Sequence, residues 1–391
     1  MAAAMIYVQH LLGIGHLMRS RQVAEALAGA GFEVHLVSGG EPAGGRPPRG
    51  VRTVQLPPIH VADGTLDPLL GPTGHPVDEA FRRERRDALL AAFDAAAPSV
   101  VLVETFPFGR RALRFELVPL MERIASMRAR PLVVASVRDI LQLQRKPERA
   151  REMLDSANRW FDAVLVHGDP RFVRFEATFP LAPELQPPVH YTGFVAAPME
   201  PHTPSRTRTE VVISAGGGTV GLDVLTAALA AQRQSRFGHL QWRVLVGSTI
   251  PSKAFERLRQ SAAPGAIVER ARDDFAALLC QALISVSRAG YNTVLDVVRS
   301  GARSVLVPYA EAGETEQRMR ANRLRELDLA LVVDSGAVQP AELATAIDAA
   351  LAREHWGAWD FDCNGAQRSA ALIADLVEAG VVERGAAEWG V

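Results

Sequence analysis

The sequence has few cysteines and no long apolar run. Of its 391 residues only Cys280 and Cys363 are cysteine, and they lie far apart without metal-ligand spacing. This usage is typical of a reducing compartment and argues against a disulfide framework or a zinc cluster. No segment approaches the roughly 20 consecutive apolar residues that a membrane-spanning helix needs.

The chain also lacks an excess of charge of either sign. Lys+Arg at 43 and Asp+Glu at 44 nearly balance, and the pI is about 6.8. This balance argues against a general nucleic-acid-binding protein. The N-terminal residues MAAAMIYVQH carry no basic segment before the apolar run, so we expect no signal peptide and a cytoplasmic location.

Length and composition predict two domains, because domains typically span roughly 100–200 residues. The composition breaks at 196–208, AAPMEPHTPSRTR, which has three prolines and few large apolar residues. Such a stretch is typical of an interdomain linker. We therefore predict an N-terminal domain over 1–196, a linker over 197–208 and a C-terminal domain over 209–391.

Strands and helices alternate in both halves, which predicts two mostly parallel, doubly wound sheets of the α/β class. In the first half we expect strands at 5–9, 33–37, 99–103, 131–137, 163–166 and 190–192, with helices at 17–30, 79–97, 110–125 and 148–161. In the second half we expect strands at 211–214, 242–246, 266–268, 282–286, 304–307 and 329–333. We expect one helix there that ends at residue 231, and further helices at 274–280, 292–300, 316–327, 340–352 and 367–378. Ligands of such sheets bind at the carboxyl ends of the strands, and two facing domains form a cleft.

Two glycine turns in the second half are candidate phosphate sites, because backbone N–H groups at such turns bind anions. The loop at 216–219 joins a strand to a helix but lacks the Lys-Ser/Thr ending of a P-loop. In the second turn, Gly290 permits a sharp bend, and Asn292 or Thr293 is expected to cap the following helix. An ordinary capped strand–helix–strand unit is the alternative.

In the first half, the first strand leads into HLLGIGH, residues 10–16. This loop is not a dinucleotide fingerprint, because Met18 stands where the third glycine would be. The candidate site residues here and at later strand ends are Gly13, Gly15, Glu104, Arg138 and Asp139.

Together these segments resemble the GT-B glycosyltransferases, in particular the family 28 group of lipid-linked N-acetylglucosaminyltransferases and their relatives. The segments that carry the resemblance are GIGHLMRSRQVAEAL, ISAGGGTVG, SRAGYNTVLDVVRSGARSVLVP and ETEQRMRANRLRELDLA. Over most of the region 41–188, the resemblance to these enzymes is limited to the alternation of strands and helices. The resemblance implies two Rossmann-like domains that face a cleft and close about the linker, with a last helix that can return to the N-terminal domain.

The resemblance also implies a nucleotide-sugar site. The implied donor-binding residues are Gly216, Gly217, Gly218, Thr219, Ala271, Arg288, Gly290, Tyr291, Asn292, Thr293, Asp296, Glu316 and Gln317. The glycine turns would hold the diphosphate, Asp296 the ribose and Ala271 the base, while Glu316 and Gln317 would bind the sugar. Asp296 is one methylene shorter than the glutamate that the family usually has. A surface or interdomain ion pair for Arg288, and a solvated helix start for 316–317, are the alternatives.

His16 is the leading candidate for the base that deprotonates an acceptor hydroxyl, since imidazole titrates near neutral pH. The alternatives are a structural role for His16 and a catalytic role for Glu104, Asp139 or Asp169. His167 is expected to be structural. We identify no Asp-x-Asp metal clamp, and so we expect no metal and no cofactor besides a UDP-sugar substrate.

The predicted function is the transfer of a sugar from a nucleotide diphosphate donor to a hydroxyl acceptor. A nucleotide-sugar 2-epimerase or hydrolase and a non-catalytic binding protein are the alternatives. The segment 106–115, FPFGRRALRF, has three interpretations. The three are a membrane-surface segment for a lipid-linked acceptor at the inner membrane face, a loop whose arginines bind phosphate, and a helix start with solvated arginines.

Overall fold

The protein has two compact units, each built on a parallel sheet. The computed structural model describes residues 2–11, 13–44, 46–61, 68–144, 146–199, 208–216, 221–309, 314–334 and 338–389, with the side chains of the last helix described up to residue 380. The first unit comprises Met1–Ala197 and Phe361–Val391, and the second unit comprises Pro198–Asp360.

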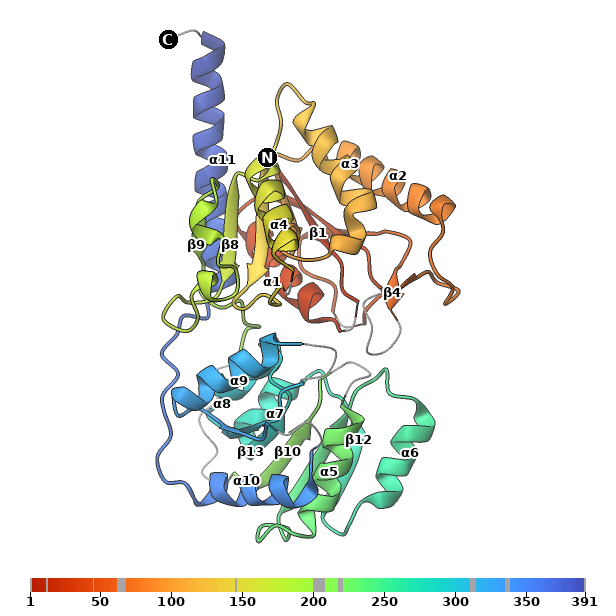
Figure 1. Cartoon of the computed structure of the whole chain (residues 1–391), viewed down its shortest axis with the longest axis vertical. Helices are drawn as coiled ribbons and strands as arrows, with labels where there is room; N and C mark the ends of the chain where they lie inside the picture. The colour runs from red at the N-terminus through yellow and green to blue at the C-terminus, as the bar shows by residue number, and fades with distance from the viewer. Residues whose placement is uncertain are drawn as a thin grey trace. The chain divides into compact units, whose positions relative to one another are not determined.

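The sheet of the first unit has seven strands in the order β3-β2-β1-β6-β7-β8-β9, all paired in parallel (Figure 1). The strands are β1 (Ala3–Val8), β2 (Glu33–Ser38), β3 (Val51–Gln55), β6 (Val100–Glu104), β7 (Leu132–Arg138), β8 (Ala163–His167) and β9 (Val189–Tyr191). A separate antiparallel pair consists of β4 (His60–Val61) and β5 (Leu69–Leu70). The central strands are continuous apolar runs because helices cover both faces of the sheet.

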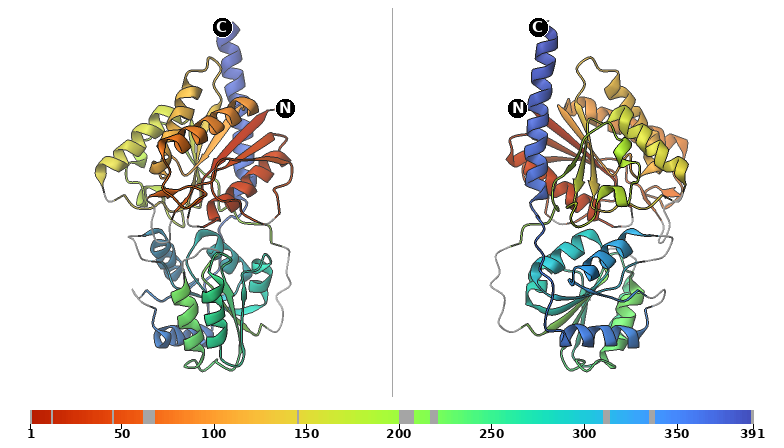
Figure 2. Two further views of the ribbon diagram at one scale, coloured as in Figure 1. Left: turned by 90° about the vertical axis from the view of Figure 1, so that its right-hand side faces the viewer. Right: turned by 60° about the vertical axis from the view of Figure 1, so that its left-hand side comes forward.

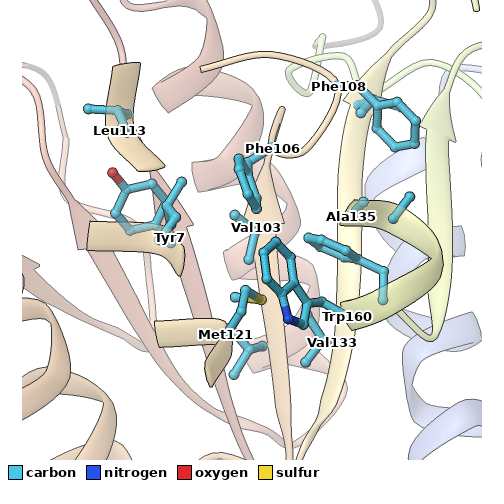
Figure 3. Packing of buried hydrophobic residues seen from close by; sticks show 14 of the residues in the cluster. Tyr7, Val103, Phe106, Phe108, Leu113, Met121, Val133, Ala135 and Trp160 are labelled. Atoms are coloured by element: carbon cyan, nitrogen blue, oxygen red, sulfur yellow. The ribbon is translucent and has the colours of Figure 1, made fainter. Parts of the chain in front are cut away.

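The helices of the first unit form two layers. One layer contains α1 (Gly15–Gly29) and α11 (Gly365–Trp389), and the other contains α2 (Glu79–Ala96), α3 (Arg114–Ala125) and α4 (Pro147–Trp160). Short 3-10 turns are η1 (Arg111–Leu113), η2 (Phe175–Ala177) and η3 (Ala182–Glu184). On the α2–α4 side, Tyr7 and Val103 from the strands pack with Met121 and Trp160 from the helices (Figure 3).

Helix α11 belongs to the first unit, so the predicted second domain ends near residue 360 and not at 391. Its buried residues Ala366, Ala370, Ile373 and Val377 recur at helical spacing. This apolar stripe packs with α1 and β1 in one buried cluster, and Figure 2 shows α11 alongside that side of the sheet. The return of the last helix that the resemblance implied is therefore present.

The second unit has six parallel strands in the order β12-β11-β10-β13-β14-β15. The strands are β10 (Glu210–Ser214), β11 (Gln241–Val246), β12 (Ala266–Arg270), β13 (Ala282–Ser287), β14 (Arg303–Leu306) and β15 (Leu331–Val332). The helices are α5 (Leu222–Gln232), α6 (Ser252–Ser261), α7 (Phe275–Gln281), α8 (Tyr291–Ser300), α9 (Glu316–Glu326) and α10 (Pro340–Ala352). Buried residues of α5, α6 and α10 form one core, and those of α7 and α8 form another.

The predicted α/β fold with two doubly wound sheets is confirmed, although strand β3, the β4–β5 pair and helix α6 were not predicted. Strand β3 lies at the sheet edge and has no fully buried residue, so its apolar signal is weak. The β4–β5 pair has strands of two residues each, which is too short for a periodic pattern. Helix α6 buries only Leu258, so its apolar stripe is also weak.

Both sheets have a point where the strand order reverses. In the first unit the reversal lies between β1 and β6, and in the second unit between β10 and β13. Ligand sites of open parallel sheets form at the carboxyl ends of the strands at this point. The loops that follow these four strands are therefore where functional side chains are expected.

Candidate active site

His16 and Glu104 meet at the switch point of the first unit. His16 lies in the first turn of α1, directly after the loop that leaves β1, and Glu104 is the last residue of β6. The Nδ1 atom of His16 is 3.0 Å from Oε1 of Glu104, and the side chains are 11% and 1% exposed. The fold thus places an imidazole against a buried carboxylate.

The Glu104 carboxylate is the centre of a hydrogen-bond network. Its Oε1 atom accepts from Arg19 and, at 3.3 Å, from the Thr105 hydroxyl. Its Oε2 atom accepts from the Ser136 hydroxyl at 2.7 Å. Burial by itself would raise the pKa of Glu104, but the charge of Arg19 and the hydrogen bond from His16 hold this pKa well below its usual range. Glu104 is therefore ionised throughout the neutral range.

This carboxylate selects the protonation state of His16. An ionised carboxylate only accepts, so the contact with Glu104 favours the tautomer that carries its proton on Nδ1, whereas Nη2 of Arg19, 3.2 Å from the same atom, can only donate. Burial and the charge of Arg110 lower the pKa of His16 well below 6.5. At neutral pH the ring is consequently neutral and its Nε2 lone pair is available to accept a proton.

Behind Glu104 the network continues into the core. The Ser136 hydroxyl is 2.9 Å from Nε2 of His167, whose Nδ1 is 2.9 Å from the Thr192 hydroxyl. His167 is fully buried, and burial lowers its pKa to about 3, so the ring is neutral. Its position between two hydroxyls agrees with a structural role.

The other carboxylates weighed as a base lie in different surroundings. Asp139 is 1% exposed and packs closely against Gly168. A Cβ added at Gly168 would lie 2.9 Å from the Cβ of Asp139. Asp169 accepts from the backbone N–H of Arg171 at 2.8 Å and forms an ion pair with its guanidinium, so it is engaged in a local turn. The carboxylate shown in contact with His16 is that of Glu104.

The remaining acceptor-side candidates lie around the same strand ends. Gly13 is exposed before α1, and Gly15 is the first residue of α1. Arg138 is the last residue of β7, next to β6 in the sheet. The sequence interpretation missed Arg19 and Ser136, although the spacing of Arg19, one helical turn after His16, was a readable signal.

The segment 106–115 does not form an aromatic membrane face. Phe106 and Phe108 are 1% and 2% exposed and belong to the core of the first unit. Arg111 and Arg114 each form an ion pair of 2.9 Å with Glu152. The interpretation in which the aromatic residues meet a membrane is therefore wrong for these two phenylalanines.

In the second unit, the turn after β13 leads into α8. Gly290 is the N-cap residue of α8, and no side chain caps the helix. The prediction that Asn292 or Thr293 caps it is wrong, because both lie inside the helix, where their side chains cannot take the capping position. The first turn also has no acidic residue, so its N–H groups suit an anion.

Arg288 fixes this turn to its neighbours. Its Nη2 atom donates to both carboxylate oxygens of Asp223 at 2.8 Å, and Asp223 lies in the first turn of α5. Its Nη1 atom donates to the carbonyls of Val307 and Pro308. The guanidinium is thus engaged in an ion pair within the second unit, and its contact with a diphosphate stays a prediction.

The start of α9 also packs against this turn. Gln317 Oε1 accepts from the backbone N–H groups of Ala289 and Tyr309 at 3.1 and 3.2 Å. Glu316 is 4% exposed and forms a 2.8 Å ion pair with Arg320, which donates to the Ala289 carbonyl. The solvated helix start considered for these residues is therefore wrong, since the structure brings Glu316 and Gln317 to the β13–α8 turn.

Glu314 is a further acidic residue at this turn that the sequence interpretation missed. Its carboxylate accepts from the backbone N–H of Glu316 at 2.6 Å and from that of Gln317. Burial and the charge of Glu316 raise its pKa. The order Glu314-Thr315-Glu316-Gln317 before a helical run was a readable capping signal.

The last donor-side candidates are more dispersed. Asp296 lies in α8, half-buried, and burial raises its pKa to about 6. Ala271 follows β12 and donates its N–H to the Val246 carbonyl at 2.8 Å. Gly216 follows β10 with a φ of +88°, which favours glycine. Gly217, Gly218 and Thr219 lie outside the described residues.

The expectation of no metal clamp overlooked one Asp-x-Asp pair, Asp360 and Asp362. Asp362 pairs with Arg368 at 2.7 Å and accepts from the Asn364 N–H, so it shapes the turn before α11. Within the described parts of the chain, no three His, Cys, Asp or Glu side chains are grouped to hold a metal ion. The same residues include no helix long and apolar enough to cross a membrane.

Comparison with known proteins agrees with this fold. Residues 212–373 match the glycosyltransferase family 28 C-terminal domain. Among solved structures, MurG of Acinetobacter baumannii superimposes with a TM-score of 0.57 at 16% identity, covering 95% of this chain and 99% of that one. A UDP-glucosyltransferase from Polygonum tinctorium does so with a TM-score of 0.59 at 16% identity, covering 97% and 94%. The chain thus has the GT-B fold of glycosyltransferases.

Curated relatives match part of the chain. UDP-N-acetylglucosamine–N-acetylmuramyl-(pentapeptide) pyrophosphoryl-undecaprenol N-acetylglucosamine transferase of Thermotoga maritima is 26% identical over 45% of this chain and 49% of its own length. The enzyme of the same name from Agrobacterium fabrum is 27% identical over 47% and 50%. The chain therefore spans about half the length of these relatives. The chain thus combines the GT-B fold with a C-terminal segment that matches the family 28 C-terminal domain.

Replacing Glu104 with alanine is expected to destabilise the first unit by about 3–5 kcal/mol, because Arg19, 2% exposed, would keep a buried charge without its partner. The measurement is hydrogen–deuterium exchange of peptides from β6 and β7, which reports on this unit by itself. Exposed Glu122→Ala is the control, with an expected change of about 0.5 kcal/mol or less. Unchanged protection in Glu104→Ala would contradict the buried pair.

Proposed function

We propose that this protein transfers a sugar from a nucleotide diphosphate donor, UDP-linked, to a hydroxyl acceptor, with His16 as the base. The observation that carries the proposal is the His16–Glu104 pair at the switch point of the first unit. The family 28 C-terminal domain over residues 212–373 supports the donor side. The donor named for the curated relatives, a UDP-sugar, supports uridine as the base.

In this proposal, Nε2 of His16 takes the proton of the acceptor hydroxyl, and the oxygen attacks the anomeric carbon. The bond between that carbon and the diphosphate oxygen breaks, and the leaving diphosphate keeps the electron pair. Glu104 orients the ring through Nδ1 and stabilises the imidazolium that forms. The network from Ser136 holds the carboxylate in place during the proton transfer.

On the donor side, the uncapped first turn of α8 would receive the diphosphate, since its N–H groups and helix dipole favour negative charge. Arg288 and Gln317 would act by holding the loops that shape this turn. Asp296 would accept hydrogen bonds from the ribose hydroxyls. Electrostatic stabilisation of the leaving group by the protein then requires no metal ion in the mechanism that we propose.

Replacing His16 with alanine is expected to lower transfer by about 10²–10⁴-fold, the usual contribution of a general base. The affinity for UDP, measured by the thermal shift that UDP causes, should change by no more than about twofold, since the donor residues lie in the other unit. The transfer assay incubates a panel of labelled UDP-sugars with and without cell extract. Exposed His75→Ala is the matched control and should behave as the wild type.

The same assay separates the alternatives. Product that forms only with extract, and that His16→Ala loses, supports the transferase. Turnover of donor without extract would instead indicate an epimerase or hydrolase, and binding without turnover a non-catalytic protein. Transfer at the wild-type rate by His16→Ala would contradict the role of this histidine.

UDP affinity is expected to fall as the pH decreases through about 6, because the pKa of Asp296 is raised to about 6 and only the ionised form accepts two hydroxyl hydrogen bonds. Losing these charged contacts should weaken binding by about tenfold or more between pH 7.5 and pH 5. Calorimetric titration with UDP over this range is the measurement.

Asp296→Asn and Asp296→Glu are compared with the wild type in the same titrations. All three proteins meet the same titration of the UDP phosphate, so their difference isolates the side chain. The asparagine variant should bind weakly at pH 7.5 with a shallower pH dependence, and the glutamate variant should retain the pH dependence. An asparagine variant with wild-type affinity and pH dependence would show that Asp296 does not bind the ribose.

A further inference from the structure

An ion pair joins the starts of α5 and α8 at the switch point of the second unit. Helix α5 follows β10 and helix α8 follows β13, and the last residues of these strands, Ser214 and Ser287, are partners in the sheet register. Arg288 comes directly after β13, and its Nη2 atom donates to both carboxylate oxygens of Asp223 at 2.8 Å. Asp223 lies in the first turn of α5. The proposed reaction gives a task to Arg288 but none to Asp223.

Arg288 is the fixed end of this pair. Its side chain is 9% exposed, and its Nη1 atom donates to the carbonyls of Val307 and Pro308 at 3.2 and 3.3 Å. Its guanidinium carbon also lies 5.6 Å from the centre of the Tyr309 ring. Because the guanidinium cannot turn away without losing these contacts, the pair fixes the position of Asp223 and, with it, the start of α5.

Both helices that the pair joins begin without a side-chain cap. Gly221 is the N-cap residue of α5, and Gly290 is the N-cap residue of α8. Glycine has no side-chain oxygen, so the first N–H groups of both helices can bind an external acceptor. Helix starts bind phosphate through such N–H groups and through the helix dipole. One phosphate needs one helix start, whereas a diphosphate needs two at the correct spacing.

The charge of Asp223 argues against a direct contact with phosphate. A carboxylate repels a phosphate, and a carboxylate in the first turn of α5 would compete for the dipole of that helix. The ion pair with Arg288 compensates this negative charge. What Asp223 contributes to a diphosphate site is therefore the geometry that the ion pair imposes.

We propose that Asp223 is a positioning residue for the donor diphosphate. Through Arg288 it sets the spacing between the first turns of α5 and α8, so that one phosphate binds at each helix start. This role rests on the proposed function, which supplies the ligand, a nucleoside diphosphate. The preference of the protein for two phosphates over one then depends on the Asp223–Arg288 pair.

The test compares the affinities of the full chain for UDP and UMP by calorimetric titration at pH 7.5. In Asp223→Asn the UDP affinity should fall at least about tenfold, as expected when a charged hydrogen bond is lost. The UMP affinity should change by no more than about threefold, because the start of α8, which Gln317 still holds, is enough for a single phosphate. Asp223→Glu keeps the charge and should retain more of the UDP affinity than Asp223→Asn.

The direction of the change separates geometry from charge. Asparagine removes a negative charge close to the bound phosphates, which by electrostatics alone would strengthen UDP binding. Weaker UDP binding by Asp223→Asn therefore reports the lost spacing. Arg288→Lys keeps the positive charge but loses the planar guanidinium, and it should also bind UDP weakly. The double variant should bind UDP about as weakly as Arg288→Lys alone, because both changes break the same contact.

Asp348→Asn is the matched control. Asp348 lies in α10 and forms an ion pair of 3.2 Å with Arg236, which lies in the loop after α5. This variant removes a comparable pair at the opposite end of the same helix. It should bind UDP and UMP as the wild type does, so a general loosening of the second unit cannot account for the result expected of Asp223→Asn.

An unchanged or higher UDP affinity in Asp223→Asn, or an equal loss of UDP and UMP affinity, would overturn the role of Asp223. Absence of UDP binding by the wild type would overturn this role together with the donor side of the proposed function. A chain that binds UDP and shows the expected losses, but transfers no sugar, would retain the role of Asp223 and lose the proposed function.

Discussion

The buried carboxylate of Glu104 is the interaction on which the first unit's site depends. It connects α1 through Arg19 and His16, the β6–α3 loop through Thr105, and β7 through Ser136. Removing a carboxylate from water is unfavourable unless its oxygens are paired and hydrogen-bonded. The four contacts supply that compensation, and they also fix the orientation of the His16 ring.

In the second unit, other polar side chains hold the loops at the switch point together. Arg288 joins the start of α5 to the loop after β14 through Asp223 and two carbonyls, and Gln317 joins that loop to the β13–α8 turn. These side chains satisfy the surrounding loops but leave the N-terminus of α8 without a side-chain cap. In both units, polar side chains thus hold the loops at a switch point, where ligands of open parallel sheets bind.

Much of the fold could be predicted from the sequence because each central strand is a short apolar run. The alternation of strands and helices predicted Gly290 at a strand end, whereas the catalytic role proposed for His16 came from the family resemblance. The partners Ser136 and Asp223 could not be assigned, because contacts between segments far apart in the chain depend on which strands are neighbours. The prediction that Asn292 caps α8 failed because the helix begins at Tyr291, before Asn292, and Gly290 is its N-cap residue.

The protonation state of His16 is what the mechanism depends on most. Nitrogen-15 NMR of the imidazole rings, with the His16 signals assigned by their loss in His16→Ala, measures it directly. We predict a proton on Nδ1, a free Nε2 at neutral pH, and a pKa well below 6.5 because the ring is buried beside Arg110. A ring protonated on Nε2, or an imidazolium at pH 7, would show that His16 cannot act as the base with Glu104 as its partner.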